Sequence, residues 1–255
     1  KTEKELCYDC HDDKALKEFK HLPVDKGECH ECHDPHSSPY VYQLRDENDK
    51  RLCYMCHKNK EQTKYVHTSV ADGNCKGCHD PHSSNTKCQL RANNNDFCYL
   101  CHQSQKEEFD KKVVHQPIKE ENGCLKCHAY HGSPYYRNLR GDYPEEHQIN
   151  YAPEKFGICF TCHDSKMAAY QFTNEKGTNF RRGELNLHYV HVNQQKKRGR
   201  RCTVCHSPHA ADNYRMLCDF VPFGAKDFRY KYPVGFNQNK VGKSCLPGCH
   251  GRKFY

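Results

Sequence analysis

Hydrophobic residues are thinly and irregularly spread along the 255-residue chain, and polar residues separate them almost everywhere. No run of hydrophobic residues approaches the length of a membrane span. Fifteen Gly and twelve Pro residues, together with many Asp, Asn and Ser residues, favour turns over long helices or strands. The pattern predicts a chain that is mostly coil, with short helices and little or no β-sheet.

Such a chain lacks the apolar side chains that an ordinary domain of this length requires. Only 35% of its residues are hydrophobic, a figure that includes 20 cysteines, and Trp is absent. Ordering the backbone costs about 1–2 kcal/mol per residue, so a stable fold needs another source of buried apolar surface. The arrangement of the cysteines indicates what that source is.

One short motif occurs nine times. Eight copies read C-x-x-C-H, and the last, Cys245–His250, carries one extra spacer residue. C-x-x-C-H is typical of c-type haem attachment, in which the two thiols bond to the porphyrin and the histidine is an axial ligand of the iron. The sequence therefore predicts nine c-type haems, which would form a haem-stack core.

These motifs define two sets of predicted haem-binding residues. The predicted thioether cysteines are Cys7, Cys10, Cys29, Cys32, Cys53, Cys56, Cys75, Cys78, Cys98, Cys101, Cys124, Cys127, Cys159, Cys162, Cys202, Cys205, Cys245 and Cys249. The predicted proximal iron ligands are His11, His33, His57, His79, His102, His128, His163, His206 and His250. Structural zinc sites and disulfide frameworks do not require a histidine after every second cysteine, and here that histidine is never missing.

The motifs come in pairs, which predicts a single continuous domain built of repeats. Residues 1–52, 53–97, 98–158 and 159–244 would each carry a haem pair, and residues 245–255 the ninth haem. Each pair has one histidine between its motifs and another just after its second motif. We expect these recurring histidines to be distal iron ligands: His21, His36, His67, His82, His115, His131, His191 and His209.

Two further features accompany the repeats. Each pair is followed by a similar segment, here called the leash, which comprises residues 42–45, 88–91, 137–140 and 215–218 in turn. The third and fourth repeats are lengthened at 132–158 and 164–201, where we expect contacts that the basic repeat does not make.

The ninth haem has no distal histidine in register. Three histidines remain, and the order of preference is His188, which lies one helical turn before His191, then His147, then His30. Met55 lies inside a motif spacer, and Met167 and Met216 recur in no register, so packing or contact with a haem edge is expected of each rather than ligation. Two cysteines lie outside the motifs, Cys88 and Cys218, and both a disulfide between them and two buried thiols remain open.

This arrangement resembles the paired-C-x-x-C-H multihaem cytochromes, whose doubled motif reads C-x-x-C-H…H…C-x-x-C-H-x-x-H. The resemblance covers essentially the whole chain and implies a multihaem cytochrome c that carries electrons between bis-histidine haems. That family includes cytochromes that polymerise head-to-tail into conductive extracellular filaments, in which one subunit can donate a ligand to the next. The expected partners are a second copy of this chain, other redox proteins and extracellular electron acceptors. A discrete periplasmic or surface carrier is the alternative.

An enzyme is not expected. A multihaem oxidoreductase acting on nitrite, hydroxylamine or a sulfur oxyanion requires an open haem, and several related enzymes mark it with Lys in place of the motif histidine. No C-x-x-C-K motif is present. The irregular Cys245–His250 motif would be the suspect site of any catalysis.

Charge and location complete the expectations. The formal charge of +8 would suggest nucleic acid as a partner. Nine haems would add about −9 through their propionates, so we expect a nearly neutral protein that does not bind nucleic acid. Because c-type haem is attached outside the cytoplasmic membrane, Lys1 is expected to follow a removed export signal. The protein is expected in the periplasm, at the cell surface or outside the cell.

Overall fold

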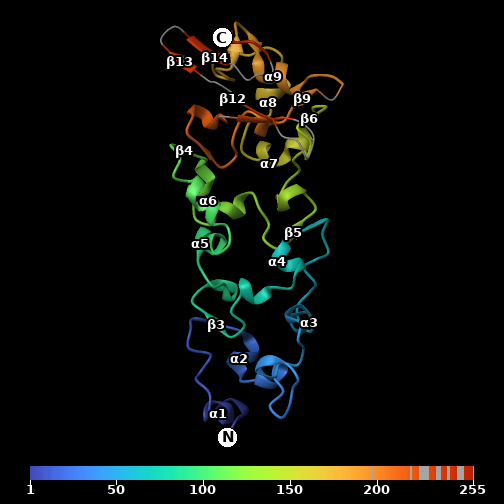
Figure 1. Cartoon of the computed structure of the whole chain (residues 1–255), viewed down its shortest axis with the longest axis vertical. Coiled ribbons are helices and arrows are strands. Elements are labelled where there is room, and N and C mark those ends of the chain that lie inside the picture. The colour runs from blue at the N-terminus through green and yellow to red at the C-terminus, as the bar shows by residue number, and fades with distance from the viewer. Residues whose placement is uncertain are drawn as a thin grey trace. The chain divides into compact units, whose positions relative to one another are not determined.

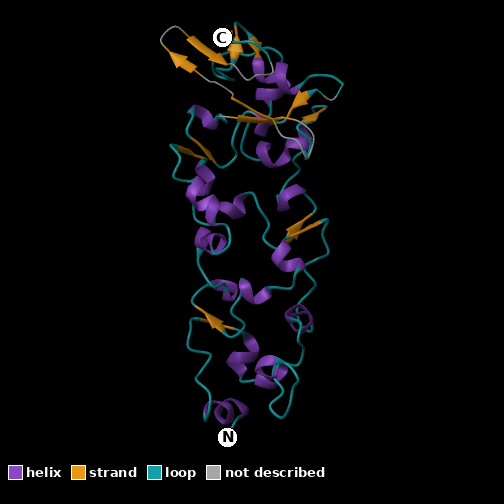
Figure 2. Cartoon of the chain, viewed as in Figure 1, coloured by secondary structure: helices purple, strands orange, loops and turns teal. Residues whose placement is uncertain are grey.

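The computed structural model describes residues 1–196, 198–218, 220–223, 230–233, 237–239, 242–245 and 250–254. Loops and turns dominate, and the helices between them are short (Figure 2). The α-helices are α1 Glu3–Tyr8, α2 Leu22–Lys26, α3 Asp49–Tyr54, α4 Thr68–Ala71, α5 Asn94–Tyr99, α6 Gln103–Glu108, α7 Gly157–Phe160, α8 Lys166–Ala169 and α9 Leu187–Val192. The 3₁₀ helices are η1 Cys29–Glu31, η2 Val41–Gln43, η3 Cys75–Gly77, η4 Lys87–Gln89, η5 Gln116–Lys119, η6 Gly123–Lys126, η7 Tyr136–Asn138, η8 Pro153–Phe156, η9 Cys202–Val204 and η10 Tyr214–Met216. The expectation of coil with short helices is confirmed.

The strands are equally short and form small antiparallel sheets. They are β1 Phe19–Lys20, β2 Tyr65–Val66, β3 Ser83–Ser84, β4 Val113–Val114, β5 Gly132–Ser133, β6 Gln148–Ile149, β7 Arg181–Arg182, β8 Leu185–Asn186, β9 Gly199–Arg200, β10 Ala210–Ala211, β11 Phe220–Phe223, β12 Tyr230–Pro233, β13 Asn237–Asn239, β14 Gly242–Cys245 and β15 Lys253–Phe254. The pairs are β1–β3, β2–β5, β4–β10, β6–β9, β7–β8 and β11–β12, and β13–β14–β15 form a three-stranded sheet. The expected scarcity of β-sheet is confirmed.

The chain divides into two compact units. The first comprises Lys1–Cys101 with Ala129–Pro134, and the second His102–His128 with Tyr135–Tyr255. In the colour scale of Figure 1 the first unit runs from blue into green and the second continues to red. Within the first unit β1 pairs with β3 and β2 with β5, so strands from different repeats lie side by side.

Local signals explain where the short helices begin and end. At α1, Thr2 and Glu5 form a capping box: the Glu5 N–H donates to Thr2 Oγ1 at 3.3 Å, and the Thr2 N–H donates to Glu5 Oε2 at 2.7 Å. Helix α2 ends at Gly27, whose φ of +79° is strained for a residue with a Cβ. These ends confine each helix to one or two turns.

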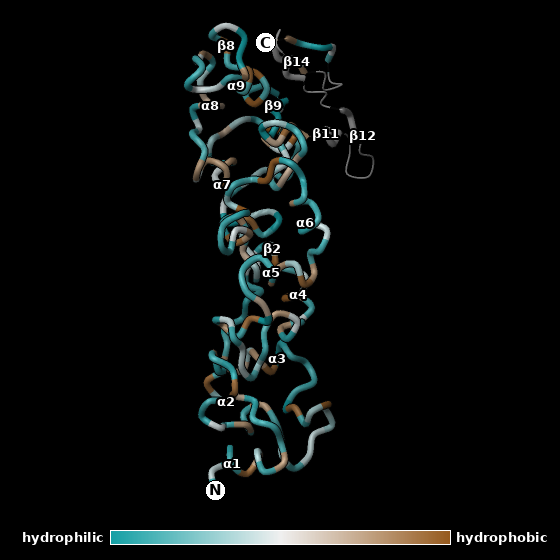
Figure 3. The backbone as a smooth tube through the Cα atoms, turned by 90° about the vertical axis from the view of Figure 1, so that its left-hand side faces the viewer, coloured by the Kyte–Doolittle hydropathy of each residue, from teal (hydrophilic) through white to brown (hydrophobic). Residues whose placement is uncertain are grey.

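A conventional apolar core exists only locally among the described residues. Tyr143, Ile149, Phe156, Ala168 and Val192 form its buried cluster, and Phe156 is fully buried. All five lie in the lengthened segments 132–158 and 164–201, where additional contacts were expected. Elsewhere the backbone is mainly hydrophilic, with apolar residues in short isolated stretches (Figure 3). Among the described helices, none is long and apolar enough to cross a membrane.

Candidate functional site

Each of the eight C-x-x-C-H motifs, which the structure describes in full, folds as a single tight turn that gathers its three predicted haem-binding groups. In the first motif the His11 N–H donates to the Cys7 carbonyl at 3.0 Å, and the same bond recurs in the second motif at 3.1 Å, from His33 to Cys29. Residues three and four positions apart lie on the same side of such a turn. Both thiols and the imidazole therefore belong to one face, as covalent attachment of a single haem requires.

Motif histidines of both units face a second imidazole, and most of these ring pairs are nearly parallel. The pairs and their centroid distances are His57–His21 at 5.9 Å, His33–His82 at 6.2 Å, His79–His131 at 6.2 Å, His163–His115 at 6.1 Å, His128–His209 at 6.3 Å, His206–His188 at 6.4 Å and His250–His191 at 6.4 Å. The interplanar angle is as small as 8° for His33 and His82, and it reaches 47° for His128 and His209.

The separation of the paired rings fits an iron between them. An imidazole nitrogen binds a transition metal at about 2 Å, and the ring centre lies roughly 1 Å behind it, so two axial rings have centres about 6 Å apart. The residues present therefore suit haem iron with two histidine ligands.

The proximal histidines of the second motifs are held by the leash. The Nδ1 atoms of His33, His79, His128 and His206 lie 2.8, 2.8, 3.1 and 2.9 Å from the carbonyl oxygens of Tyr42, Cys88, Arg137 and Arg215. A hydrogen bond from Nδ1–H to a carbonyl fixes the tautomer that leaves Nε2 for the metal. The four acceptor residues all have φ near +57°, in the left-handed region that L residues seldom adopt. The leash thus has a positioning role that the sequence did not reveal, although its recurrence in register was the signal.

Several distal histidines are oriented in the same way. His21 Nδ1 lies 3.0 Å from the Pro81 carbonyl, and His115 Nδ1 lies 3.1 Å from the Pro208 carbonyl. In α9, His191 Nδ1 lies 2.7 Å from the Leu187 carbonyl. In each case Nε2 is left to face the opposite motif histidine.

The paired rings are exchanged between neighbouring repeats. The first-motif histidine His57 faces His21, which comes from the preceding repeat. The second-motif histidine His33 faces His82, which comes from the following repeat. His163 with His115 repeats the first relationship, and His79 with His131 and His128 with His209 repeat the second. Each repeat thus borrows imidazoles from its neighbours.

The end of the series departs from this rule. His206 is a second-motif histidine but faces His188 of its own repeat, while His191 faces His250 of the ninth motif. The sequence singled out His188 for the ninth haem; the structure brings it to the eighth motif and His191 to the ninth. Both lie on α9, which fully buried Asn186 caps: its Oδ1 accepts the N–H groups of His188 at 3.0 Å and Tyr189 at 3.4 Å.

The remaining histidines lie elsewhere. His30 Nδ1 is 2.7 Å from Glu3 Oε2, an ion-pair contact between η1 and α1. His147 immediately precedes β6, and its carbonyl accepts the Arg201 N–H at 3.4 Å. His67 caps α4 in the first unit, and His102 precedes α6 in the second. Among the residues that the structure describes, no imidazole lies against His36, whose side chain is 95% exposed.

Burial favours the neutral, metal-binding form of many of these imidazoles. It lowers the pKa of His188 to about 4, assisted by the neighbouring rings of His206 and His191. Burial also lowers the pKa values of His21, His82, His115, His128, His131, His191 and His206. A neutral ring offers its nitrogen lone pair to a metal at neutral pH.

Thiols of motifs that are consecutive in the sequence are also neighbours in space. Burial, together with the neighbouring thiol, raises the pKa of Cys29 beside Cys7, of Cys32 beside Cys56, of Cys53 beside Cys75 (to about 12), of Cys78 beside Cys101 and of Cys127 beside Cys162. A hydrogen bond with Cys202 raises the pKa of Cys159, and Cys205 and Cys245 pack on Val204. Cysteines of consecutive motifs therefore lie close together at the two ends of the series and along much of its length.

The remaining cysteines and methionines that the sequence analysis considered lie at scattered positions. Cys249 lies outside the described residues. Cys88 is an exposed thiol in the first unit, while Cys218 packs against Val204 in the second. Met167 packs on the apolar core and Met55 is exposed. In the part of the chain that the structure describes, no three His, Cys, Asp or Glu side chains cluster as a conventional metal site.

Comparison with known proteins identifies a family. The family model of the doubled CXXCH motif matches residues 21–62, 67–107 and 115–168, which together make up more than half of the chain. No curated protein matches this sequence. The matched segments begin at the mid-repeat histidines His21, His67 and His115. The family repeat therefore includes the histidines that we expect to be distal ligands.

Proposed function

The chain belongs to the doubled CXXCH motif family of multihaem c-type cytochromes, and from this premise we propose that it carries electrons along nine covalently bound haems. The observation that carries the proposal is the recurrence of paired imidazoles, each pair spaced to bind one iron. When bound, haem supplies one-electron chemistry at its iron. The chain's own residues fix the ligands, their tautomers and the order of the sites.

The spatial order of the haem attachment sites supports electron transfer from one site to the next. Within each unit, cysteines of consecutive motifs lie beside each other, so an attachment site in the middle of a unit has a neighbour on either side. The leash carbonyls hold the imidazoles of second motifs and strengthen them as donors. Ligation by histidine without methionine favours low reduction potentials.

A carrier fits these residues better than an enzyme. Catalysis at iron requires an open axial position, and the paired histidines would occupy both positions at the sites where they meet. The ninth motif was the suspect because of its longer spacer, and His191 faces its His250. The same series suits transfer to other redox proteins or extracellular acceptors, and the protein would act in the periplasm, at the cell surface or outside the cell.

Head-to-tail polymerisation is a second part of the proposal. If the sites form one series from the first motif to the ninth, that series would become continuous through many copies wherever its two ends met. A contact between two different surfaces propagates into a filament. Negative-stain microscopy and size exclusion of the native holoprotein test this, and a single monomeric species contradicts polymerisation without affecting the carrier function.

The carrier function has its own test. Mass spectrometry of the denatured holoprotein should show nine bound haems, and the reduced protein should deliver nine electrons per chain to a soluble ferric acceptor. A matched variant with Cys124→Ser and Cys127→Ser should lose one haem and one electron. Fewer haems than motifs in the wild-type protein, or a haem that the acceptor cannot oxidise, would contradict the proposal.

A further inference from the structure

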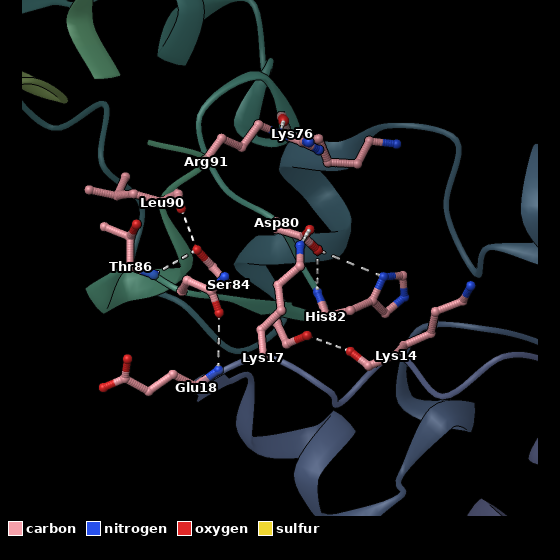
Figure 4. Close-up of polar contacts among 12 residues, drawn as sticks. Lys14, Lys17, Glu18, Lys76, Asp80, His82, Ser84, Thr86, Leu90 and Arg91 are labelled. Carbon is pink, nitrogen blue, oxygen red and sulfur yellow. Dashed lines mark hydrogen bonds and ion pairs between the residues drawn. The ribbon is translucent and has the colours of Figure 1, made fainter. Parts of the chain in front are cut away.

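The partners of Nδ1 differ in kind among the paired imidazoles. Most of them are backbone carbonyls, at distances of 2.7–3.1 Å. Carboxylates meet two rings: His82 Nδ1 lies 3.9 Å from Asp80 Oδ1 (Figure 4), and a carboxylate of α6 lies 3.5 Å from His209 Nδ1. A hydroxyl takes this place at His188, whose Nδ1 lies 3.2 Å from Thr178 Oγ1. No other described ring of these pairs has a partner of that kind.

Thr178 belongs to a short loop that is anchored to α9. The Thr178 N–H donates to the Asn174 carbonyl at 3.1 Å, and Thr178 Oγ1 accepts the Phe180 N–H at 3.1 Å. The Phe180 carbonyl in turn accepts the N–H of Leu187, the first residue of α9, at 3.0 Å. The β7–β8 hairpin connects the loop to the helix. The hydroxyl is therefore held in place relative to the helix that carries the ligand.

The side chain of Phe180 packs on both distal rings of α9. Its ring is edge-on to that of His188, with centroids 5.1 Å apart, and it lies at 28° to that of His191, with centroids 5.6 Å apart. Thr178 and Phe180 belong to the lengthened segment 164–201, where we expected contacts that the basic repeat does not make. One of these contacts is thus made directly to the ligands of the eighth and ninth sites.

The hydroxyl of Thr178 is a weak acceptor for His188. When Nε2 binds a metal, a neutral imidazole carries its proton at Nδ1, so the hydroxyl oxygen must accept it. The same oxygen already accepts the Phe180 N–H. Its distance of 3.2 Å from Nδ1 is also longer than those of the carbonyl contacts, and longer hydrogen bonds are weaker.

The strength of this hydrogen bond affects the metal. A strong bond from Nδ1–H raises the basicity of the ligand, and a more basic axial ligand favours the ferric state of haem iron. His206, the other ring of this pair, has a leash carbonyl at 2.9 Å. The eighth site thus combines one strongly held and one weakly held imidazole. At the ninth site, His191 and His250 both have carbonyls at 2.7 Å.

We propose that Thr178 is a positioning residue that sets the reduction potential of the eighth haem. Its hydroxyl holds His188 with Nε2 toward His206 but, as a weak acceptor, leaves this haem easier to reduce than a carbonyl in its place would. The inference rests on the proposed haem at Cys202 and Cys205. A haem that is easier to reduce holds an electron longer, so Thr178 also influences how fast electrons leave the eighth site.

Redox titration of the holoprotein, followed by absorption and electron paramagnetic resonance, tests the proposal with three variants. Thr178→Val removes the acceptor and should make one haem easier to reduce by about tenfold in its equilibrium constant, which is roughly 59 mV. Thr178→Asn offers an amide carbonyl and should shift the same haem in the opposite direction. Thr178→Ser keeps the hydroxyl and should retain the wild-type potential.

Two controls separate this effect from a structural one. Thr173→Val removes a hydroxyl of the same segment, which donates to the Asn174 carbonyl at 3.4 Å, and it should shift no potential. In a His188→Ala background, Thr178→Val should also shift no potential, because the ring through which Thr178 acts is gone.

Three results would overturn the proposal. The first is a Thr178→Val protein with nine haems and unchanged potentials. The second is an equal shift in the Val and Ser variants, which would assign the effect to packing, and the third is a shift that survives His188→Ala. If the Val variant does not fold, an unchanged or raised potential in the Asn variant contradicts the proposal. A wild-type protein without haem at Cys202 and Cys205, seen by mass spectrometry, would instead refute the haem assignment.

Discussion

The backbones of His21 and His82 are joined by a hydrogen bond of 2.9 Å, yet their imidazoles face two different motif histidines, His57 and His33. One strand contact therefore positions ligands for two consecutive haem sites in two different repeats. The doubled motif is the unit of the sequence, whereas the unit of the structure is this contact between repeats.

The roles of His188 and His191 can be separated by substitution. His188→Ala should open the eighth site and His191→Ala the ninth, because these rings face His206 and His250 respectively. Each variant should add one high-spin haem by electron paramagnetic resonance, and the double variant should add two. If either single variant remained low-spin, the corresponding pairing would be wrong. His30→Ala is the control, since His30 contacts Glu3, and it should leave all spin states unchanged.

Asn186 should control both of these haems at once. Its side chain is fully buried and satisfies two N–H groups of α9 and the carbonyls of Met167 and Tyr170, both at 2.8 Å. Asn186→Ala leaves those groups unpaired and should destabilise the fold by about 2–3 kcal/mol. Chemical unfolding measures this loss. The altered course of α9 should also broaden the electron paramagnetic resonance signals of the eighth and ninth haems. The control is Asn193→Ala at the other end of α9, which should affect these signals less.

The leash should tune the potentials of second-motif haems. Arg215 has φ +56°, and its carbonyl lies 2.9 Å from His206 Nδ1. Arg215→Pro forces φ near −65° and so turns the carbonyl of residue 215 away from His206 Nδ1, and the eighth haem should be easier to reduce. Arg215→Gly accepts the left-handed φ and should keep the potential while stabilising the fold by up to about 1 kcal/mol. Spectroelectrochemical titration distinguishes the two, and equal potentials in both variants would refute a role for the leash.

Residues 34–38 and 80–84 have the same sequence, so their turns provide a matched pair for a pH experiment. Burial opposes ionisation of Asp80, but the His82 N–H and Lys17 ammonium lower its pKa overall. Its carboxylate therefore contributes stability that is fully present above pH 3.8 and is lost as the pH falls through the lowered pKa. Asp80→Asn should cost about 1 kcal/mol at pH 7, and the difference from wild type should vanish in acid.

Asp34→Asn is the control for that comparison. Asp34 accepts the same kind of turn bond, but no lysine meets it in the described chain. Its substitution should cost less than that of Asp80. Equal costs at both positions would mean that the contact with Lys17 contributes nothing.

Much of the site could be read from the sequence, because haem attachment is encoded locally. A thiol, a second thiol and an imidazole within one turn can be recognised without knowing the fold, and the matching family model agrees with that reading. The scarcity of apolar residues likewise predicted the short helices. The register of His21, His82, His115 and His209 marked them as candidates for the same reason.

The pairing of the rings could not be read in this way. Which imidazole faces which motif depends on strands of two residues, such as β1 and β3, whose sequences carry almost no signal. His188 was assigned to the ninth site because of its distance from His191 along a helix. It faces His206 instead, because the capped helix α9 presents the two rings to different motifs.

Exchange of ligands between repeats also sets an order of maturation. As the chain emerges N-terminus first, the site at His57 finds His21 already made, whereas the site at His33 must wait for His82. Where the rings are exchanged between repeats, a first-motif site finds its second imidazole earlier in the chain and a second-motif site finds it later, whereas the His206 site finds His188 earlier in its own repeat. Each repeat that follows supplies the ring that a second-motif site of the repeat before it lacks, so we expect the ligand pairs to be completed in order from the N-terminus to the C-terminus.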